Sequence, residues 1–155
     1  MPRQYKVLSF RGLLADQAQD EIALERQNAN VAYRIRKFEV MSQSPKDADL
    51  VGIVKVWREK QSSPHTATTI NFGDPNLLAV ALWREGNLLT EANTFHTIFD
   101  DILFSRNIYV TSVDSDGSGG MNYYLELEEV PVAASTLMQI KLGTARRNIS
   151  DEMGA

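Results

Sequence analysis

The stretch IYVTSV-DSDGSGG-MNYYLELEEV, Ile108 to Val130, decides the fold of this chain. Apolar and polar residues alternate on both sides of a loop made of Asp, Ser and Gly, which is the pattern of two β-strands joined by a hairpin loop. Pro131 ends the second strand, because proline cannot donate a hydrogen bond to a sheet ladder. A hairpin of this kind is structural framework, and nothing in it has the pattern of a catalytic motif.

Further strands are predicted along the rest of the chain, in short segments spaced about 8 to 12 residues apart and separated by turn-forming residues. Most of them alternate, whereas residues 66–72 are Thr-rich and residues 77–83 are a continuous apolar run; a helix is the alternative at residues 50–57 and 77–83. The predicted strands span residues 4–14, 31–41, 50–57, 66–72, 77–83, 88–91, 94–99 and 102–104. After Pro131, Ser135 is a residue type favoured at helix N-caps, and apolar residues with helical spacing follow it up to about Arg147. The sequence therefore predicts an all-β fold, a β-sandwich or jelly-roll-like arrangement, with a short C-terminal α-helix.

A chain of 155 residues has the length of one domain, which we expect to span residues 1–155 as a single β-sandwich. A domain of this size buries roughly 70% of the surface that its unfolded chain exposes, so it needs no disulfide to be stable. Residues 15–30 are polar and are expected to form a loop, a helical turn or an arm that orders on assembly. Residues 148–155 are expected to be a frayed tail.

Composition narrows the classes of function. The net charge is −4, and the resulting field repels phosphate, so we expect no recognition of nucleic acid. The chain has no cysteine, which excludes disulfides, thiolate metal sites and a cysteine nucleophile. No apolar run approaches the roughly 20 residues that cross a bilayer, and the N-terminus lacks the apolar segment of a signal peptide. These features predict a protein made in a cytosol, a host cytosol included, without a membrane partner.

The loop between the two strands of the hairpin resembles the start of a calcium-binding loop. Asp114, Asp116 and Ser118 could offer oxygen ligands to a hard cation. The pattern is incomplete, because its twelfth position is Leu125 and not an acidic residue. We therefore interpret the segment as a hairpin tip, with Asp114 and Asp116 as weak metal candidates, and expect no cofactor.

Glu126 and Glu128 share one face of the strand that follows this loop. Paired carboxylates hydrolyse glycosides when they are held about 5 to 9 Å apart across a cleft, but acids at alternate positions also occur on any solvated sheet face. His65 and His96 are far apart in the sequence and do not by themselves make a metal site. The chain has no phosphate-binding loop, nucleophile elbow or HExxH motif, and the sequence predicts that it is not an enzyme.

The residues expected at subunit contacts are charged or aromatic. They are Arg34, Arg36, Trp57, Trp83, Tyr123 and Tyr124. Strict alternation places the two arginines and Phe38 on one face of their strand, opposite Tyr33 and Ile35. The four aromatic residues suit either a core or a contact surface, and an exposed Trp or Tyr could also form a platform for a sugar.

One part of the chain resembles a known family. The segment from Phe99 to Val130 is similar to a recurrent segment of small virion structural proteins of marine bacteriophages, in which a D-I-Y-V-T type motif is followed by a Gly/Ser-rich loop, an N-Y-Y-L-E-L-E strand and a helix built around T-L-K-x-I/L. The matching elements here are Asn107–Thr111, Asn122–Glu128 and Thr136–Ile140. Two N-terminal segments, Leu8–Leu14 and Asn28–Arg34, are also similar.

The resemblance implies a role in assembly. It predicts a non-enzymatic minor capsid, vertex, cement or head–tail connector subunit, located in the virion and assembled in the host cytoplasm. The implied partners are further copies of this chain and other virion proteins, such as major capsid, portal or tail subunits. The alternative is a carbohydrate-binding β-sandwich module for attachment to a host surface, with Asp114, Asp116 or Glu126 beside an exposed aromatic platform, and a hydrolase using Glu126 or Glu128 is a third hypothesis.

Overall fold

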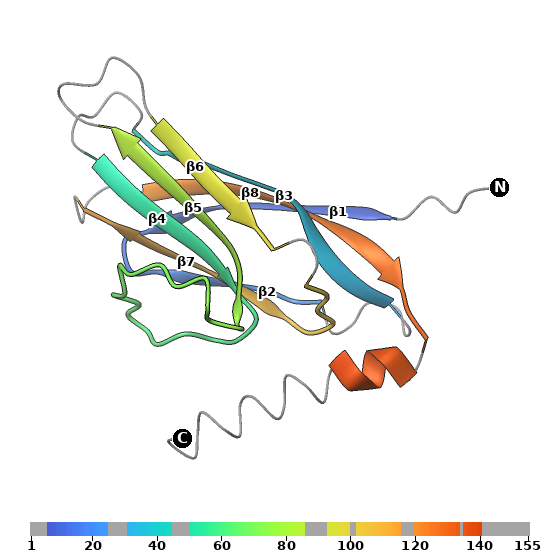
Figure 1. Ribbon diagram of the computed structural model, residues 1–155. Helices are drawn as coiled ribbons and strands as arrows, with labels where there is room; N and C mark the ends of the chain where they lie inside the picture. The colour runs from blue at the N-terminus through green and yellow to red at the C-terminus, as the bar shows by residue number, and fades with distance from the viewer. Residues whose placement is uncertain are drawn as a thin grey trace.

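The computed structural model describes residues 6–24, 31–44, 50–85, 93–99, 102–115, 120–133 and 135–140 (Figure 1). This part contains the strands β1 (Val7–Ala15), β2 (Gln19–Ile22), β3 (Val31–Ser42), β4 (Leu50–Trp57), β5 (Leu77–Glu85), β6 (Asn93–Ile98), β7 (Ile108–Asp114) and β8 (Gly120–Pro131). A short helix, residues 135–140, follows the last strand. The predicted fold class, all-β with a short C-terminal helix, is confirmed.

The strands form two antiparallel sheets that enclose one core. The three-stranded sheet has the order β1-β8-β3, and the five-stranded sheet has the order β2-β7-β4-β5-β6. In a jelly roll, the first, eighth, third and sixth strands make one sheet and the second, seventh, fourth and fifth make the other. This chain has that order with one departure, because β6 pairs with β5 and not with β3.

Alternation along β8 shows how the core forms. Met121, Leu125 and Leu127 have no exposed surface and Tyr123 is 5% exposed, whereas Asn122, Tyr124 and Glu126 between them face away from the core. Side chains from both sheets meet these residues in a single apolar cluster. Each large apolar side chain that is fully buried contributes about 1.5–3 kcal/mol, so the two inner faces hold the sheets together.

A β-bulge in β3 changes which side chains enter the core. The register of β3 against β8 shifts between Ile35 and Lys37. One extra residue at this point moves the following residues to the opposite face, so Phe38 joins Ile35 in the core with 1% of its surface exposed. The prediction that Phe38 lies on the face of Arg34 and Arg36 was therefore wrong.

Four other local predictions needed correction. The segment Ile108 to Val130 does not form the predicted hairpin, because β7 pairs with β2 and β4 in the five-stranded sheet, whereas β8 pairs with β1 and β3 in the three-stranded sheet. Residues 15–30 are not only loop or arm, because β1 continues to Ala15 and β2 pairs with β7 and contributes the buried Ile22. Residues 66–72 form no strand and are exposed, and the strand predicted at residues 102–104 is a single bridge between Phe104 and Tyr33. The strand predicted at residues 88–91 and the tail at 148–155 lie outside the described residues.

A long connection between β4 and β5, residues 58–76, packs on the outer face of the five-stranded sheet, and we call it the strap (Figure 1). Lys55 lies on that face and donates a hydrogen bond from Nζ to the backbone carbonyl of Thr69 in the strap. His65 of the strap packs edge-on against Trp57, with 5.9 Å between the ring centroids. Lys55 and Trp57 are therefore buried although they face away from the core between the sheets.

None of the described helical residues forms a segment long and apolar enough to cross a membrane.

Candidate functional site

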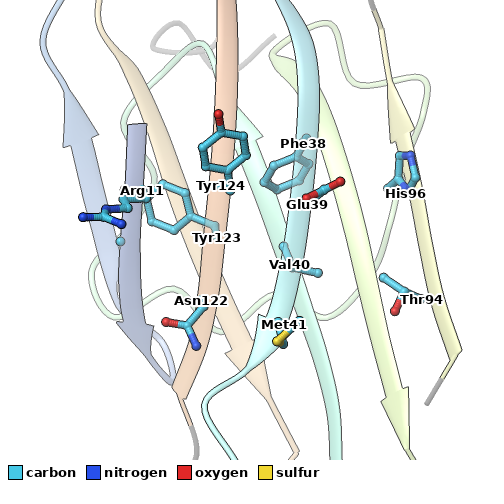
Figure 2. A pocket seen from close by; sticks show the side chains of 11 residues that line it. Arg11, Phe38, Glu39, Val40, Met41, Thr94, His96, Asn122, Tyr123 and Tyr124 are labelled. Carbon is cyan, nitrogen blue, oxygen red and sulfur yellow. The ribbon is translucent and has the colours of Figure 1, made fainter. Parts of the chain in front are cut away.

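The outer face of the three-stranded sheet carries an open groove of about 820 Å³ that extends sideways to β6 (Figure 2). Its lining comes from four strands. The residues are Arg11, Gly12, Phe38, Glu39, Val40, Met41, Thr94, His96, Asn122, Tyr123 and Tyr124. These positions are far apart in the sequence, and strand pairing brings them together.

The register of the sheet sets the floor of the groove. Tyr124 of β8 pairs with Arg11 on one side and with Glu39 on the other, so the three side chains form a row across the sheet. In the next row, Asn122 lies between Leu13 and Met41. Rows of this kind place side chains of neighbouring strands about 4.5–5.5 Å apart, close enough for one ligand to touch all of them.

Strand β6 forms the wall of the groove. Thr94 and His96 share the inner face of the five-stranded sheet with Ala81 and Trp83, their neighbours on β5. They are nevertheless exposed, and Figure 2 shows β6 beyond the edge of β3. Because β6 pairs with β5 and not with β3, β6 lies to the side of the three-stranded sheet, and the side chain of His96 faces the groove.

Tyr123 supports the floor from below. Its hydroxyl donates a hydrogen bond to Oδ2 of Asp20, at 3.0 Å, and burial together with this carboxylate raises the pKa of Tyr123. Its ring packs against Gly12, where a Cβ atom would lie 2.8 Å from Cε1 of the ring. Glycine at this position of β1 is therefore required by the close approach of the ring.

Charged side chains order one end of the outer face. Arg34 pairs with Glu128 at 2.9 Å, and Nε of Arg36 lies 3.9 Å from Glu126. The hydroxyl of Tyr124 donates to Glu126 at 2.7 Å, and this hydrogen bond raises the pKa of Tyr124. Exposed ion pairs contribute at most about 1 kcal/mol each, so their main effect is to orient the side chains.

These contacts place several residues considered as functional from the sequence. Arg34 and Arg36 are exposed, but each is engaged with a glutamate of β8, and Tyr124 lines the groove. Glu126 and Glu128 are the partners of those arginines on the outer sheet face. The two carboxylates are therefore held by cations of the neighbouring strand.

The remaining aromatic contact candidates are buried. Trp57 and Trp83 are each 7% exposed, and Tyr123 is 5% exposed. The indole of Trp57 donates a buried hydrogen bond to Oγ1 of Thr111, at 2.8 Å. Their burial leaves these three residues almost no surface to offer a partner or a sugar, so we assign them to the interior of this chain.

The weak metal candidates do not come together as a site. Asp114 is buried at the end of β7, and its backbone N–H donates to Oδ1 of Asp16 at 2.8 Å. Asp116 lies outside the described residues. Within the described ranges, no three His, Cys, Asp or Glu side chains are grouped in a way that could hold a metal ion.

The two histidines occupy opposite faces of the five-stranded sheet. His65, in the strap, is 4% exposed, and burial, and to a lesser degree the charge of Lys55, lowers the pKa of its imidazole. Burial also lowers the pKa of Lys55 itself. His96 is exposed in the groove, so the two rings cannot act on one ligand.

The groove combines the ring of Tyr124, the apolar side chain of Met41 and three planar polar groups, those of Arg11, Glu39 and Asn122. This set suits contact with an elongated partner that presents both polar and apolar groups. Sequence reasoning found Tyr124 but missed the others, since single charged or apolar residues on alternating strands carry no signal of their own.

No protein-family model, no curated protein and no solved structure matches the chain.

Proposed function

We propose that this chain is a non-enzymatic structural protein of a bacteriophage virion, a minor capsid, vertex, cement or head–tail connector subunit. It acts through self-assembly and through contacts with other virion proteins, such as major capsid, portal or tail subunits. The observation that carries the proposal is the jelly-roll order of the strands, since jelly rolls are a common architecture of viral shell proteins. The resemblance of the segment from Phe99 to Val130 and of the helix to small phage virion proteins supports the same role.

Exposed apolar side chains supply surfaces for such contacts. Phe72 is 57% exposed and Phe95 is 61% exposed at one side of the five-stranded sheet. Leu13 and Met41 are 50% and 56% exposed on the outer face of the three-stranded sheet. Scattered apolar residues are ordinary on a protein surface, but these lie on strands or beside them, where a partner's sheet could cover them.

The test is to find the chain in purified particles. Mass spectrometry of density-purified virions of the phage that encodes it should detect its peptides at a fixed ratio to the major capsid protein. Particles stripped of loosely adsorbed host protein by a high-salt wash are the control. Peptides that are absent from the washed particles but abundant in the infected-cell lysate would contradict a structural role.

A second candidate function rests on the groove. Aromatic rings stack on the apolar faces of sugars, while planar polar side chains bond their hydroxyls, so Tyr124 with Arg11, Glu39 and Asn122 could bind a saccharide of a host surface. Because Trp57 and Trp83 are buried, the platform would be Tyr124 and not a tryptophan. A glycan array would test this: Y124A should lose any saccharide signal, whereas V7A, exposed on the same sheet outside the groove, should keep it.

A further inference from the structure

Within the described part of the chain, strand β6 is a sheet edge without the usual protection against pairing. The two sheets end in four edge strands, namely β1, β3, β2 and β6. Natural edge strands avoid pairing with other chains by carrying charges, proline or bulges, or by being very short. The edge β3 has a bulge and four charged residues, β2 has four residues of which two are acidic, and β1 has Arg11 at its centre.

In contrast, β6 has none of these features. Its sequence, NTFHTI, contains no Lys, Arg, Asp, Glu, Pro or Gly, and its pairing with β5 continues without a bulge over all six residues. Threonine, phenylalanine and isoleucine are also residue types that favour strands. The segment therefore has the composition of an inner strand at the position of an outer one.

The backbone of β6 offers hydrogen bonds on its outer side. The N–H of Phe99 bonds the carbonyl of Leu78, which continues the β5–β6 ladder. In an antiparallel pair the bonded positions alternate, so Phe95 and Thr97 point their backbone groups toward β5, and Thr94, His96 and Ile98 point theirs away from it. Among the described residues, no backbone group takes up these outward bonds of β6.

An apolar strip runs beside this edge. Phe95, Thr97 and Phe99 lie on the outer face of the sheet, and Phe72 of the strap packs edge-on against Phe99 with 5.2 Å between the centroids. Phe95 is 61% exposed and so contributes little to the stability of the isolated chain. A strand added to β6 would place its own side chains across from Phe95.

We propose that β6 pairs antiparallel with β6 of a second copy of this chain about a two-fold axis, which joins two five-stranded sheets into one. A second copy fits because the edge is self-complementary: the uncharged strand meets itself without opposing like charges, and each copy satisfies the other's outward N–H and carbonyl groups. Phe95 and Thr97 then fall at the non-bonded positions, where Cα atoms of facing strands are about 4.5 Å apart. Such a contact uses the same edge on both copies and therefore closes as a dimer.

The first experiment measures mass in solution by light scattering over a dilution series. The purified chain should have twice its monomer mass of 17.4 kDa, and F95K should have the monomer mass, because two lysines would face each other or flank the pairing edge. V7K, at an exposed position of the other sheet outside the groove, should remain dimeric. A monomeric unmodified chain, or an F95K variant that stays dimeric, would overturn the proposal.

The second experiment uses the absence of cysteine from the chain. A two-fold axis at residue 95, 96 or 97, near the centre of β6, places residue 95 or 97 of one copy opposite residue 95 or 97 of the other, so the double variant F95C/T97C should form a disulfide-linked dimer under mild oxidation in each of these three registers. L13C/M41C, on exposed positions of the three-stranded sheet, should form far less. Equal cross-linking of the two variants would refute pairing through β6.

This inference specifies the self-assembly contact of the proposed virion subunit and in that sense rests on the proposed function. The two can fail separately. A chain that is found in washed virions but is monomeric in solution retains the structural role and loses the β6 dimer. A chain that dimerises through β6 but is absent from virions retains the dimer and loses the structural role.

Discussion

Replacement of Thr111 by valine tests the packing that holds the strap on the five-stranded sheet. Thr111 is 1% exposed, and its Oγ1 accepts the hydrogen bond of the Trp57 indole at 2.8 Å. Valine has nearly the same shape as threonine but cannot accept this bond. The indole N–H would then be buried without a partner, beside the ring of His65.

The expected cost follows from this burial. A buried donor left unsatisfied destabilises a protein by about 1–3 kcal/mol. For a chain of this length, 1 kcal/mol lowers the melting temperature by about 2–4 °C, so T111V should melt roughly 2–12 °C below the unmodified protein. Because both residues face the strap, the loss should be accompanied by faster proteolysis within residues 58–76.

A double-mutant cycle isolates the hydrogen bond. W57F removes the donor, so Thr111→Val should cost much less in the W57F background than in the unmodified protein, with a coupling of about 1–3 kcal/mol in urea unfolding. This comparison subtracts the packing that phenylalanine loses against His65. If T111V costs the same in both backgrounds, the bond between Trp57 and Thr111 contributes nothing measurable and our account of the strap is wrong.

Two further predictions concern His65 and Gly12. Because burial and Lys55 lower the pKa of His65 below its usual 6.5, the unfolded chain takes up a proton that the folded chain does not as the pH falls below about 6.5. The free energy of unfolding should therefore decline between about pH 7 and 5.5, and H65Q should reduce this decline more than H96Q, whose side chain is exposed. The free energy of unfolding of G12A, measured in urea, should be about 1–3 kcal/mol lower than that of the unmodified chain, because the new Cβ would overlap the buried ring of Tyr123. Equal stability of the two proteins would show that the ring can move aside.

The sequence by itself was sufficient for the fold class. Alternation with period two identified the segments that became β1, β3, β4, β6, β7 and β8, because the side chains of a strand face opposite sides whatever strand lies next to it. The segment that became β5 was identified as a short continuous apolar run. It did not identify β2, whose four residues are too few to show a period. It also misplaced Phe38, since a bulge in β3 depends on the partner strand and not on the local pattern.

Only the tertiary structure decided where a partner could bind. The groove joins Arg11, Glu39, His96 and Tyr124 from four strands, and their proximity follows from sheet register over long sequence separations. The open edge of β6 arises because this strand pairs with β5 and leaves β3 alone, a choice between two long-range pairings that the local sequence does not encode. Periodicity is a property of neighbouring residues, whereas strand order and edge exposure are properties of the whole packed chain.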